Sequence, residues 1–414
     1  MGFFVSRFLG LGRDLLVSAR WGVTEQSDMV LFLINFPDMV VGMLMGTAVS
    51  ALLVPQFVKS KDANGDMNLY SSAQQALGLY GLIVTLVILL FSGELIRLLV
   101  PGFDLSTQAQ AQDLLKWVAF AILFSFVAGV PRAGLLSKEY FKITSFENLF
   151  FNVPLIAIIY FLVNSESYSF LGWAVLLASL ARYLYLQVGA RWIGFRLRPV
   201  RMSWSSKVVL RFLSLNVTSG CTIILFFTLR ALATELGPGQ LSIFSYFFKF
   251  LELPFGILTT IVFSIGLPRL SSSTQIRHLK VLTYIFIFSV FVSLASAFIL
   301  VLMQGHGFTF FKVTAGDIDL LLKTLIIGVF ALPARLIMTY LQSFEYSNQS
   351  SKISLMANLA ALGVSVIVIF SAGSSLSLNH LAWVLNIYYY MSAIIMLVWA
   401  FTHGFSTHSS KSAG

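Results

Sequence analysis

Long, uninterrupted apolar runs are the feature that most constrains how this chain can fold. Of its 414 residues, 57% are hydrophobic and only 11% are charged, and the mean hydropathy is +0.86. Soluble domains carry about 25% charged residues, and a helix needs about 20 apolar residues to cross the hydrocarbon of a bilayer. The runs are too long and continuous for the ~10-residue alternating strands of a membrane barrel. The sequence therefore predicts an all-α polytopic membrane protein.

Charged or Gly/Pro-rich breaks divide the chain into twelve apolar segments. With the N-terminus in the cytoplasm, the positive-inside rule places Lys and Arg in the connections after even-numbered segments. That side carries fifteen basic loop residues and the opposite side carries five. The distribution predicts twelve spans with both termini cytoplasmic. The segments are 2–22, 28–56, 71–98, 113–136, 147–164, 169–190, 208–233, 241–267, 279–303, 320–343, 353–372 and 380–402.

The loop richest in basic residues falls between the sixth and seventh segments and predicts a division into two six-helix lobes around a central cavity. The expected parts are an N-terminal lobe over 1–190, a basic cytoplasmic linker over 191–207, a C-terminal lobe over 208–402 and a cytoplasmic tail over 403–414. Two similar halves in parallel orientation suit a transporter that holds its substrate between lobes.

Prolines make the second and eighth segments alike. Each segment has a proline near its start and another near its end, namely Pro37 with Pro55 and Pro254 with Pro268. A proline removes a backbone hydrogen-bond donor from a helix. We therefore expect the two helices to break or bend at Pro37 and Pro254.

The sequence carries no signature of a soluble enzyme. It has no Walker A loop, no HExxH pattern and no Gly-rich dinucleotide turn, and its only cysteine, Cys221, lies in an apolar run. We expect no catalysis, no cofactor and no metal site, and we interpret the five histidines as surface residues. The formal charge of +10 is assigned to positive-inside loops and not to nucleic-acid binding.

Charges within the spans are the informative residues, because an ionised side chain in the bilayer needs a partner or a wet cavity. The first segment holds Arg7, Arg13 and Asp14. One interpretation is that Arg7 reaches the interface while Arg13 and Asp14 form a structural pair. The alternative is that the first helix lines a water-filled cavity with guanidinium groups, which suit phosphate or pyrophosphate.

The second and eighth segments add further charges. Lys249 and Glu252 are spaced i, i+3, which favours a local salt bridge, and Asp28 stands at the entrance to the second segment. Several cations with few acids and an apolar surround favour a large anionic amphiphile as ligand. The seven basic residues within the spans are Arg7, Arg13, Arg182, Arg211, Arg230, Lys249 and Arg335.

Short motifs in chain order resemble the MurJ (MviN) family of lipid II flippases. The family typically reads S-R-x-L-G-x-x-R-[DE], then G-x-x-x-x-x-D, L-P-N and F-V-P, then APGF, Y-x-x-R-L-x-E-x-P-x-G-[VI] and LPxLS. The matching residues here are Ser6 to Asp14, Gly22 with Asp28, Phe36-Pro37, Leu53-Val54-Pro55, Val100 to Phe103, Tyr246 to Ile257 and Leu267 to Ser271. The match is collinear across about two thirds of the chain.

This resemblance implies a fold and a substrate. The fold is that of the multidrug/oligosaccharidyl-lipid/polysaccharide exporters, and the activity is translocation of undecaprenyl-pyrophosphate-linked peptidoglycan precursor, lipid II, across the bacterial cytoplasmic membrane by alternating access. The implied partners are this lipid-linked glycan, membrane lipids and cell-wall synthesis proteins. The implied substrate-binding residues are Arg7, Arg13, Asp28, Lys249 and Glu252, and we expect Asp14 and Arg230 to line the same cavity.

The sequence departs from the family pattern in three places. The family has basic residues four to five positions after its Leu-Pro, and Val41 and Gly42 stand there; its later acid-glycine pair falls at Gly46-Thr47. Lys249 replaces an arginine, and the family usually has fourteen spans. Two alternatives therefore stay open: a flippase for lipid-linked exopolysaccharide or O-antigen units, and an ion-coupled multidrug exporter.

Overall fold

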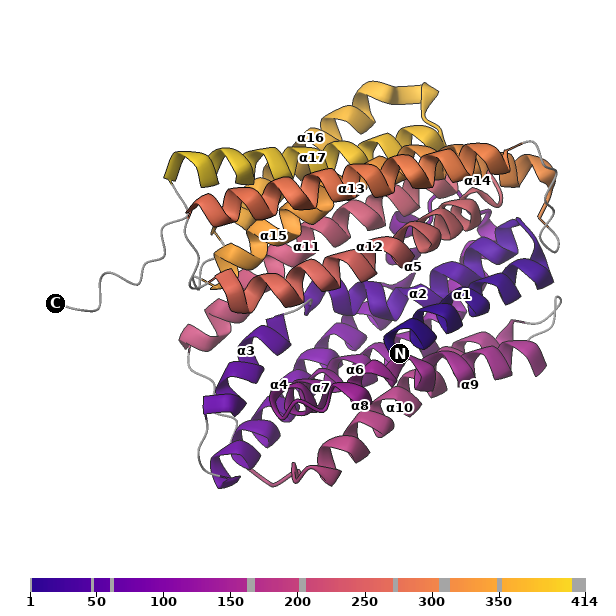
Figure 1. Ribbon diagram of the computed structural model, residues 1–414. Helices are drawn as coiled ribbons and strands as arrows, with labels where there is room; N and C mark the ends of the chain where they lie inside the picture. The colour runs from indigo at the N-terminus through magenta and orange to yellow at the C-terminus, as the bar shows by residue number, and fades with distance from the viewer. Residues whose placement is uncertain are drawn as a thin grey trace. The chain divides into compact units, whose positions relative to one another are not determined.

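The computed structural model describes residues 2–45, 48–59, 63–161, 168–200, 206–270, 275–304, 313–347 and 352–403 (Figure 1). These residues form helices joined by short connections, and they contain no strand. The chain separates into two compact units, residues 1–242 and 243–414. The prediction of an all-helical membrane fold is confirmed.

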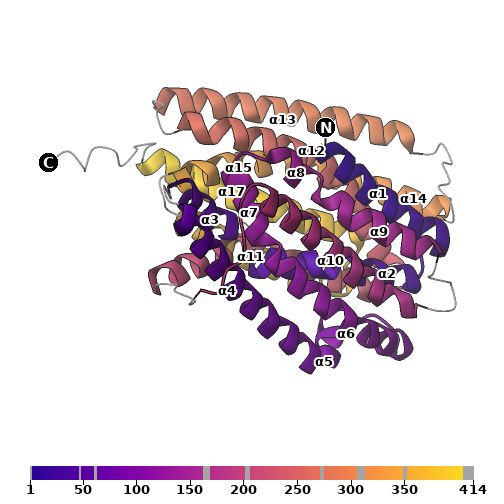
Figure 2. The ribbon, with the colours of Figure 1, turned by 90° about the horizontal axis from the view of Figure 1, so that it is seen from below.

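The described residues of the first unit form eleven helices and the first turn of a twelfth. They are α1 Gly2–Trp21, α2 Glu25–Leu44, α3 Ala48–Lys59, α4 Ala63–Leu90, α5 Ser92–Leu99, α6 Leu105–Val127, α7 Gly129–Ser137, α8 Phe141–Ser145, α9 Glu147–Phe161, α10 Ser169–Trp192 and α11 Ser206–Glu235. Helix α6 packs against α2, α4 and α10, and α10 packs against α9 (Figure 2). Helix α11 packs on α2 and α3 of this unit. The lobe limits expected from the basic loop stay a prediction.

In the second unit, the described part of the chain forms the rest of α12 and five further α-helices. The elements are α12 Gln240–Leu270, α13 Gln275–Met303, α14 Ala315–Gly328, the 3-10 turn η1 Val329–Ala331, α15 Leu332–Ser347, α16 Lys352–Ala372, the 3-10 turn η2 Gly373–Ser375 and α17 Leu378–His403. Helix α17 packs against α14, α15 and α16, and α13 packs against α14 and α15. Each of the twelve predicted segments therefore coincides with one helix or with consecutive helices.

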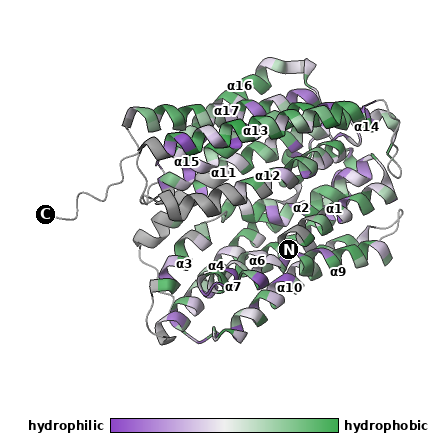
Figure 3. Cartoon of the chain, in the orientation of Figure 1, coloured by the Kyte–Doolittle hydropathy of each residue, from purple (hydrophilic) through white to green (hydrophobic). Residues whose placement is uncertain are grey.

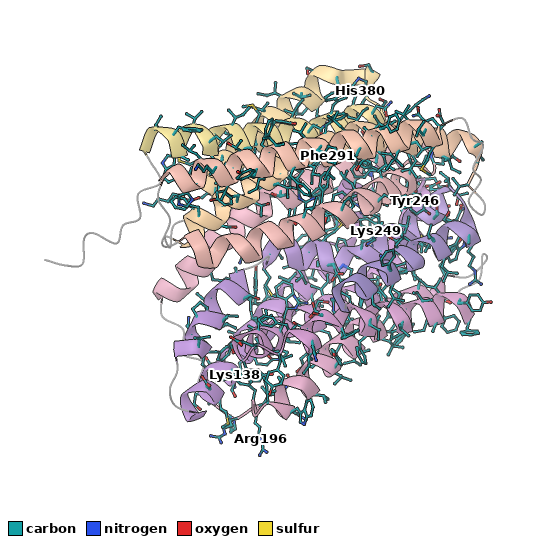
Figure 4. The ribbon with its side chains drawn as sticks, viewed as in Figure 1. Lys138, Arg196, Tyr246, Lys249, Phe291 and His380 are labelled. Carbon is teal, nitrogen blue, oxygen red and sulfur yellow. The ribbon has the colours of Figure 1, made fainter. Side chains whose placement is uncertain are left out.

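Eight helical stretches among the described residues are long and apolar enough to span a membrane. The pair Ala315–Gly328 and Ala331–Glu345, bent by 44°, adds a ninth candidate if it forms a single span. Apolar side chains face outward along α13, where Phe291 is 69% exposed (Figures 3 and 4). Such a surface matches lipid hydrocarbon. The count of twelve spans stays a prediction.

The expected break at Pro37 was wrong. Helix α2 runs through Pro37 to Leu44, and the interruption comes after Met45, before α3 begins at Ala48. Helix α12 likewise runs through Pro254. A single missing donor is tolerated within a membrane helix when neighbouring groups pack around it, and Pro37 is buried.

Connections that follow odd-numbered segments meet at one end of the first unit. The guanidinium of Arg20, at the end of α1, donates to the carbonyl of Ile159 at the end of α9. The backbone N–H of Asp104 donates to Glu25 Oε1 over 2.7 Å. Hydrogen bonds to Asp104 from Thr107 at the start of α6 lower the pKa of the Asp104 carboxyl. The connections after the first, third and fifth segments therefore lie at the same end of the first unit.

Connections that follow even-numbered segments meet at another end of this unit. Lys138 Nζ lies 3.0 Å from Asp66 Oδ2, and Phe195, in the loop after α10, stacks on Tyr70 with ring centroids 5.0 Å apart. Figure 4 places Lys138 and Arg196 close to each other at this end. Loops that alternate between two ends are what consecutive membrane spans require.

Thiol labelling will test which end faces the cytoplasm. In a Cys221→Ser background, cysteines at Lys142 and Arg198 should be protected from an impermeant reagent in intact cells, whereas cysteines at Asp104 and Glu235 should react. The reason is the excess of basic residues on the first side. Reaction at position 198 from outside, with protection at position 104, would reverse the predicted orientation.

Candidate functional site

A buried ion pair occupies the middle of α1. Arg13 Nη2 lies 2.7 Å from Asp14 Oδ1, and Arg13 Nε donates to the same oxygen over 2.8 Å. The remaining guanidinium donors reach Asn152 Oδ1 on α9 at 3.2 Å and Asn35 Oδ1 on α2 at 3.1 Å. Arg13 is 3% exposed and Asp14 is 1% exposed. Arg13 is thus paired with Asp14 in the structure, and the roles of Arg7 and Arg13 toward a ligand stay predictions.

Arg7 and Arg230 complete the predicted set in this unit. Arg7 lies in α1, but its side chain is outside the described residues. Arg230, in α11, is buried at 8% exposure, and the charges of Asp14 and Asp28 attract it while that of Arg13 repels it. Arg230 therefore interacts electrostatically with Arg13, Asp14 and Asp28 of the same unit, and its role as a cavity residue stays a prediction.

Asp28 joins the start of α2 to the start of α12. Its Oδ2 accepts a hydrogen bond from the N–H of Gly239 at 2.8 Å, and its Oδ1 accepts from the N–H and the hydroxyl of Ser242, both at 2.5 Å. Gly239 has φ +82°, and a Cβ there would overlap Val23. The carboxylate satisfies N–H groups that the first turn of a helix leaves without partners. Its described contacts thus hold a helix end.

Two ion pairs in the first unit received no role from the sequence. Arg182 Nη1 on α10 lies 2.9 Å from Asp38 Oδ1 on α2, and Arg132 Nε on α7 lies 2.7 Å from Glu147 Oε2 on α9. Arg182 was recognisable as a basic residue within a span. Its partner was not, because the two are 144 positions apart.

In the second unit, Glu252 of α12 pairs with Arg335 of α15. The Arg335 guanidinium also lies over the rings of Phe255, at 5.3 Å, and Tyr389, at 5.5 Å. Lys249 lies one turn before Glu252 on the same helix and is half-buried (Figure 4). From the sequence, only Lys249 was predicted as a partner of Glu252, whereas the described ion pair of Glu252 bridges two helices.

The interpretation of all five histidines as surface residues was wrong for His278. Its side chain is fully buried, its Nδ1 lies 2.9 Å from the hydroxyl of Tyr340, and its ring contacts Phe344. It packs α13 against α15. His380, by contrast, is exposed at the start of α17. Within the described part of the chain, no group of three or more His, Cys, Asp and Glu side chains is placed to hold a metal ion.

Comparison with known proteins identifies the family. A family model described as lipid II flippase MurJ matches residues 17–412. The chain belongs to the MurJ family. A probable lipid II flippase MurJ of Buchnera aphidicola subsp. Acyrthosiphon pisum is 24% identical over 421 residues, covering 92% of this chain and 79% of the relative. A probable lipid II flippase MurJ of Vibrio cholerae is 26% identical over 294 residues, covering 66% of this chain and 55% of the relative.

Solved structures share the fold. One described as lipid II flippase MurJ in an inward closed conformation matches with a TM-score of 0.79 and 19% identity, covering 97% of this chain and 86% of that chain. An inward-facing multidrug resistance MATE family transporter of the MOP superfamily matches with a TM-score of 0.75 and 15% identity, covering 96% and 94%. MurJ and MATE proteins thus have the architecture seen here.

One departure from the MurJ pattern has a structural reason. Gly42, where the pattern has a basic residue, lies where α2 approaches α11 closely, and a Cβ on it would come 2.6 Å from Ile223 Cδ1. A long basic side chain at position 42 therefore requires Ile223 to move. Gly46 and Thr47, at the place of the pattern's acid-glycine pair, lie outside the described residues.

Proposed function

We propose that this multi-pass membrane protein moves lipid II between the leaflets of the bacterial cytoplasmic membrane by alternating access. The observation that carries the proposal is the family match over residues 17–412. The chemistry agrees, because a pyrophosphate-linked lipid needs cations for its head and an apolar surround for its tail. The membrane identity of the chain also suits a transporter and not an enzyme.

Basic residues of each unit have proposed roles. In the first unit, Arg7 and Arg13 supply positive charge for phosphate. The neighbouring charges of Asp14 and Arg230 adjust the electrostatic potential around these two arginines. In the second unit, Lys249 supplies charge and Glu252 helps to orient it. Asp28 acts by holding the start of α12, in keeping with its three described hydrogen bonds. Guanidinium groups suit phosphate because they donate two parallel hydrogen bonds.

Genetic replacement tests this activity directly. The gene should restore growth and normal shape to a bacterium depleted of its own lipid II flippase. Lys249→Glu, which reverses the charge at the proposed position, is expressed at matched membrane levels as the control. Normal membrane levels of the wild-type chain without any rescue would refute lipid II as the substrate.

A second candidate is a flippase for lipid-linked exopolysaccharide or O-antigen units. It is favoured by Val41 and Gly42, which replace the basic residues of the family pattern in α2. Both substrates share a polyprenyl pyrophosphate and differ in the glycan. Rescue of a strain that lacks its O-antigen flippase, without rescue of lipid II flipping, would favour this candidate.

Lys249 should tolerate arginine but not glutamate. Lys249→Arg keeps the charge and adds the planar fork of donors, so transport should stay within about twofold of wild type. Lys249→Glu reverses the charge, and transport should fall at least roughly tenfold, since one charge-assisted hydrogen bond is worth about 1.5–3 kcal/mol. Rescue of the depleted strain and membrane levels of both variants measure this. Equal activity of the two variants would exclude a charge-dependent role.

A further inference from the structure

The Asp38–Arg182 pair is unequal in exposure. Asp38 lies in α2, well inside a candidate span, yet its side chain is 51% exposed, whereas that of Arg182 is 5% exposed. A charged side chain at such a depth faces water or protein and not lipid. The exposed side of Asp38 therefore marks a water-accessible face of the first unit.

Groups other than Asp38 also hold Arg182 in place. Its Nη2 donates to Ser125 Oγ on α6 over 2.8 Å, and its guanidinium lies 4.7 Å from the ring centroid of Phe151 on α9. Its Nε has no hydrogen-bond partner among the described residues. The guanidinium is thus positioned by buried groups, and its ion-pair partner is the exposed and replaceable member of the pair.

Positive potential converges on the Asp38 carboxylate. Arg182 attracts it most strongly, and Arg13 and Arg132 add to the attraction. Arg13 and Arg132 have acidic partners of their own in Asp14 and Glu147. The place taken by the Asp38 carboxylate is therefore one that an anion prefers and a cation avoids, which argues against Asp38 as a site for a coupling ion.

We propose that Arg182 is a phosphate-binding residue for the lipid-linked pyrophosphate, and that Asp38 is an internal anion that occupies Arg182 until a phosphate of the substrate replaces it. This inference rests on the proposed function. Because Asp38 is half exposed, its side chain has room to turn away as the phosphate arrives.

Binding of a short polyprenyl pyrophosphate will test the exchange. The full chain in nanodiscs is titrated with farnesyl pyrophosphate, and farnesol serves as the ligand without phosphate. Asp38→Asn should bind farnesyl pyrophosphate about tenfold more tightly, since it removes the competing charge, and Arg182→Gln should bind it about tenfold more weakly. In the double variant, Asp38→Asn should bring little gain, because Asp38 acts through Arg182.

Matched variants separate this exchange from general effects. Asp66→Asn removes the acid of another ion pair, with Lys138, at one end of the same unit, and it should leave affinity unchanged. Arg182→Lys keeps the charge and should bind more tightly than Arg182→Gln, which guards against simple misfolding of the glutamine variant. Melting temperatures of all variants are measured in parallel.

The outcomes distinguish two failures. In the first, neither the wild type nor Asp38→Asn binds farnesyl pyrophosphate more tightly than farnesol. That result would refute the proposed substrate class and this inference with it. Binding by the wild type that Asp38→Asn fails to tighten would overturn the inference alone. An equal gain from Asp38→Asn in the presence and absence of Arg182 would also overturn it, because the effect would then be one of net charge.

Discussion

Arg13→Ala is expected to destabilise the protein severely as well as to abolish transport. The substitution leaves the Asp14 carboxylate, which is 1% exposed, without the guanidinium that lies 2.7 Å from it. Removing one member of a buried ion pair costs about 3–5 kcal/mol. The amide oxygens of Asn35 and Asn152 also lose a donor. Membrane levels and the melting temperature in detergent should both fall.

A double variant and a surface control make this prediction specific. Arg13→Ala/Asp14→Ala removes both charges and should recover much of the lost stability without recovering transport. Lys116→Ala removes the partner of Asp113 in an exposed pair on α6, where such pairs contribute about 0–1 kcal/mol, and should change little. Normal levels and melting of Arg13→Ala, with transport lost, would show that Arg13 serves the substrate and not the fold.

The helices were predictable because the apolar runs and their breaks directly encode spans. Every predicted segment corresponds to a helix or to consecutive helices, but the interruption in the second segment was placed at Pro37 and occurs after Met45. The position of a proline can be read from the sequence. The free-energy cost of the backbone hydrogen bond that it removes depends on the packing around the helix, which cannot. The sequence therefore predicts where the helices lie better than where a helix is interrupted.

The site was predictable only in part, because charges in a membrane take partners from distant helices. Arg13 and Asp14 are neighbours in sequence, and their pairing was one of the interpretations considered. The partners of Arg182 and Glu252 lie 144 and 83 positions away. Helical spacing reports pairs within one helix. Helical spacing contains no information on which helices pack together. For the same reason, the burial of His278 between α13 and α15 was not predicted.

Asp28→Ala is expected to loosen the start of α12. The substitution leaves the N–H groups of Gly239 and Ser242 without their acceptor, whereas the Ser242 hydroxyl keeps a partner in the Ser27 hydroxyl, 2.6 Å away. An unsatisfied buried donor costs about 1–3 kcal/mol, so the loss for the two N–H groups should be roughly 2–6 kcal/mol. Hydrogen exchange at Gly239 and Ser242 should accelerate by about two orders of magnitude, and transport should fall with it.

Glu25→Ala supplies the matched control for this substitution. Glu25 stands in the same first turn of α2 and accepts one hydrogen bond, from the exposed N–H of Asp104. Since water can replace that bond, its loss should cost less than about 1 kcal/mol and leave exchange at Gly239 unchanged. Asp28→Asn keeps one acceptor oxygen but turns its amide N–H donors toward the remaining N–H group. Its loss of stability should therefore lie between those of Asp28→Ala and Glu25→Ala. If Asp28→Ala abolished transport while exchange and melting stayed at wild-type values, the carboxylate would act on the substrate itself, and anchoring of α12 would not be its role.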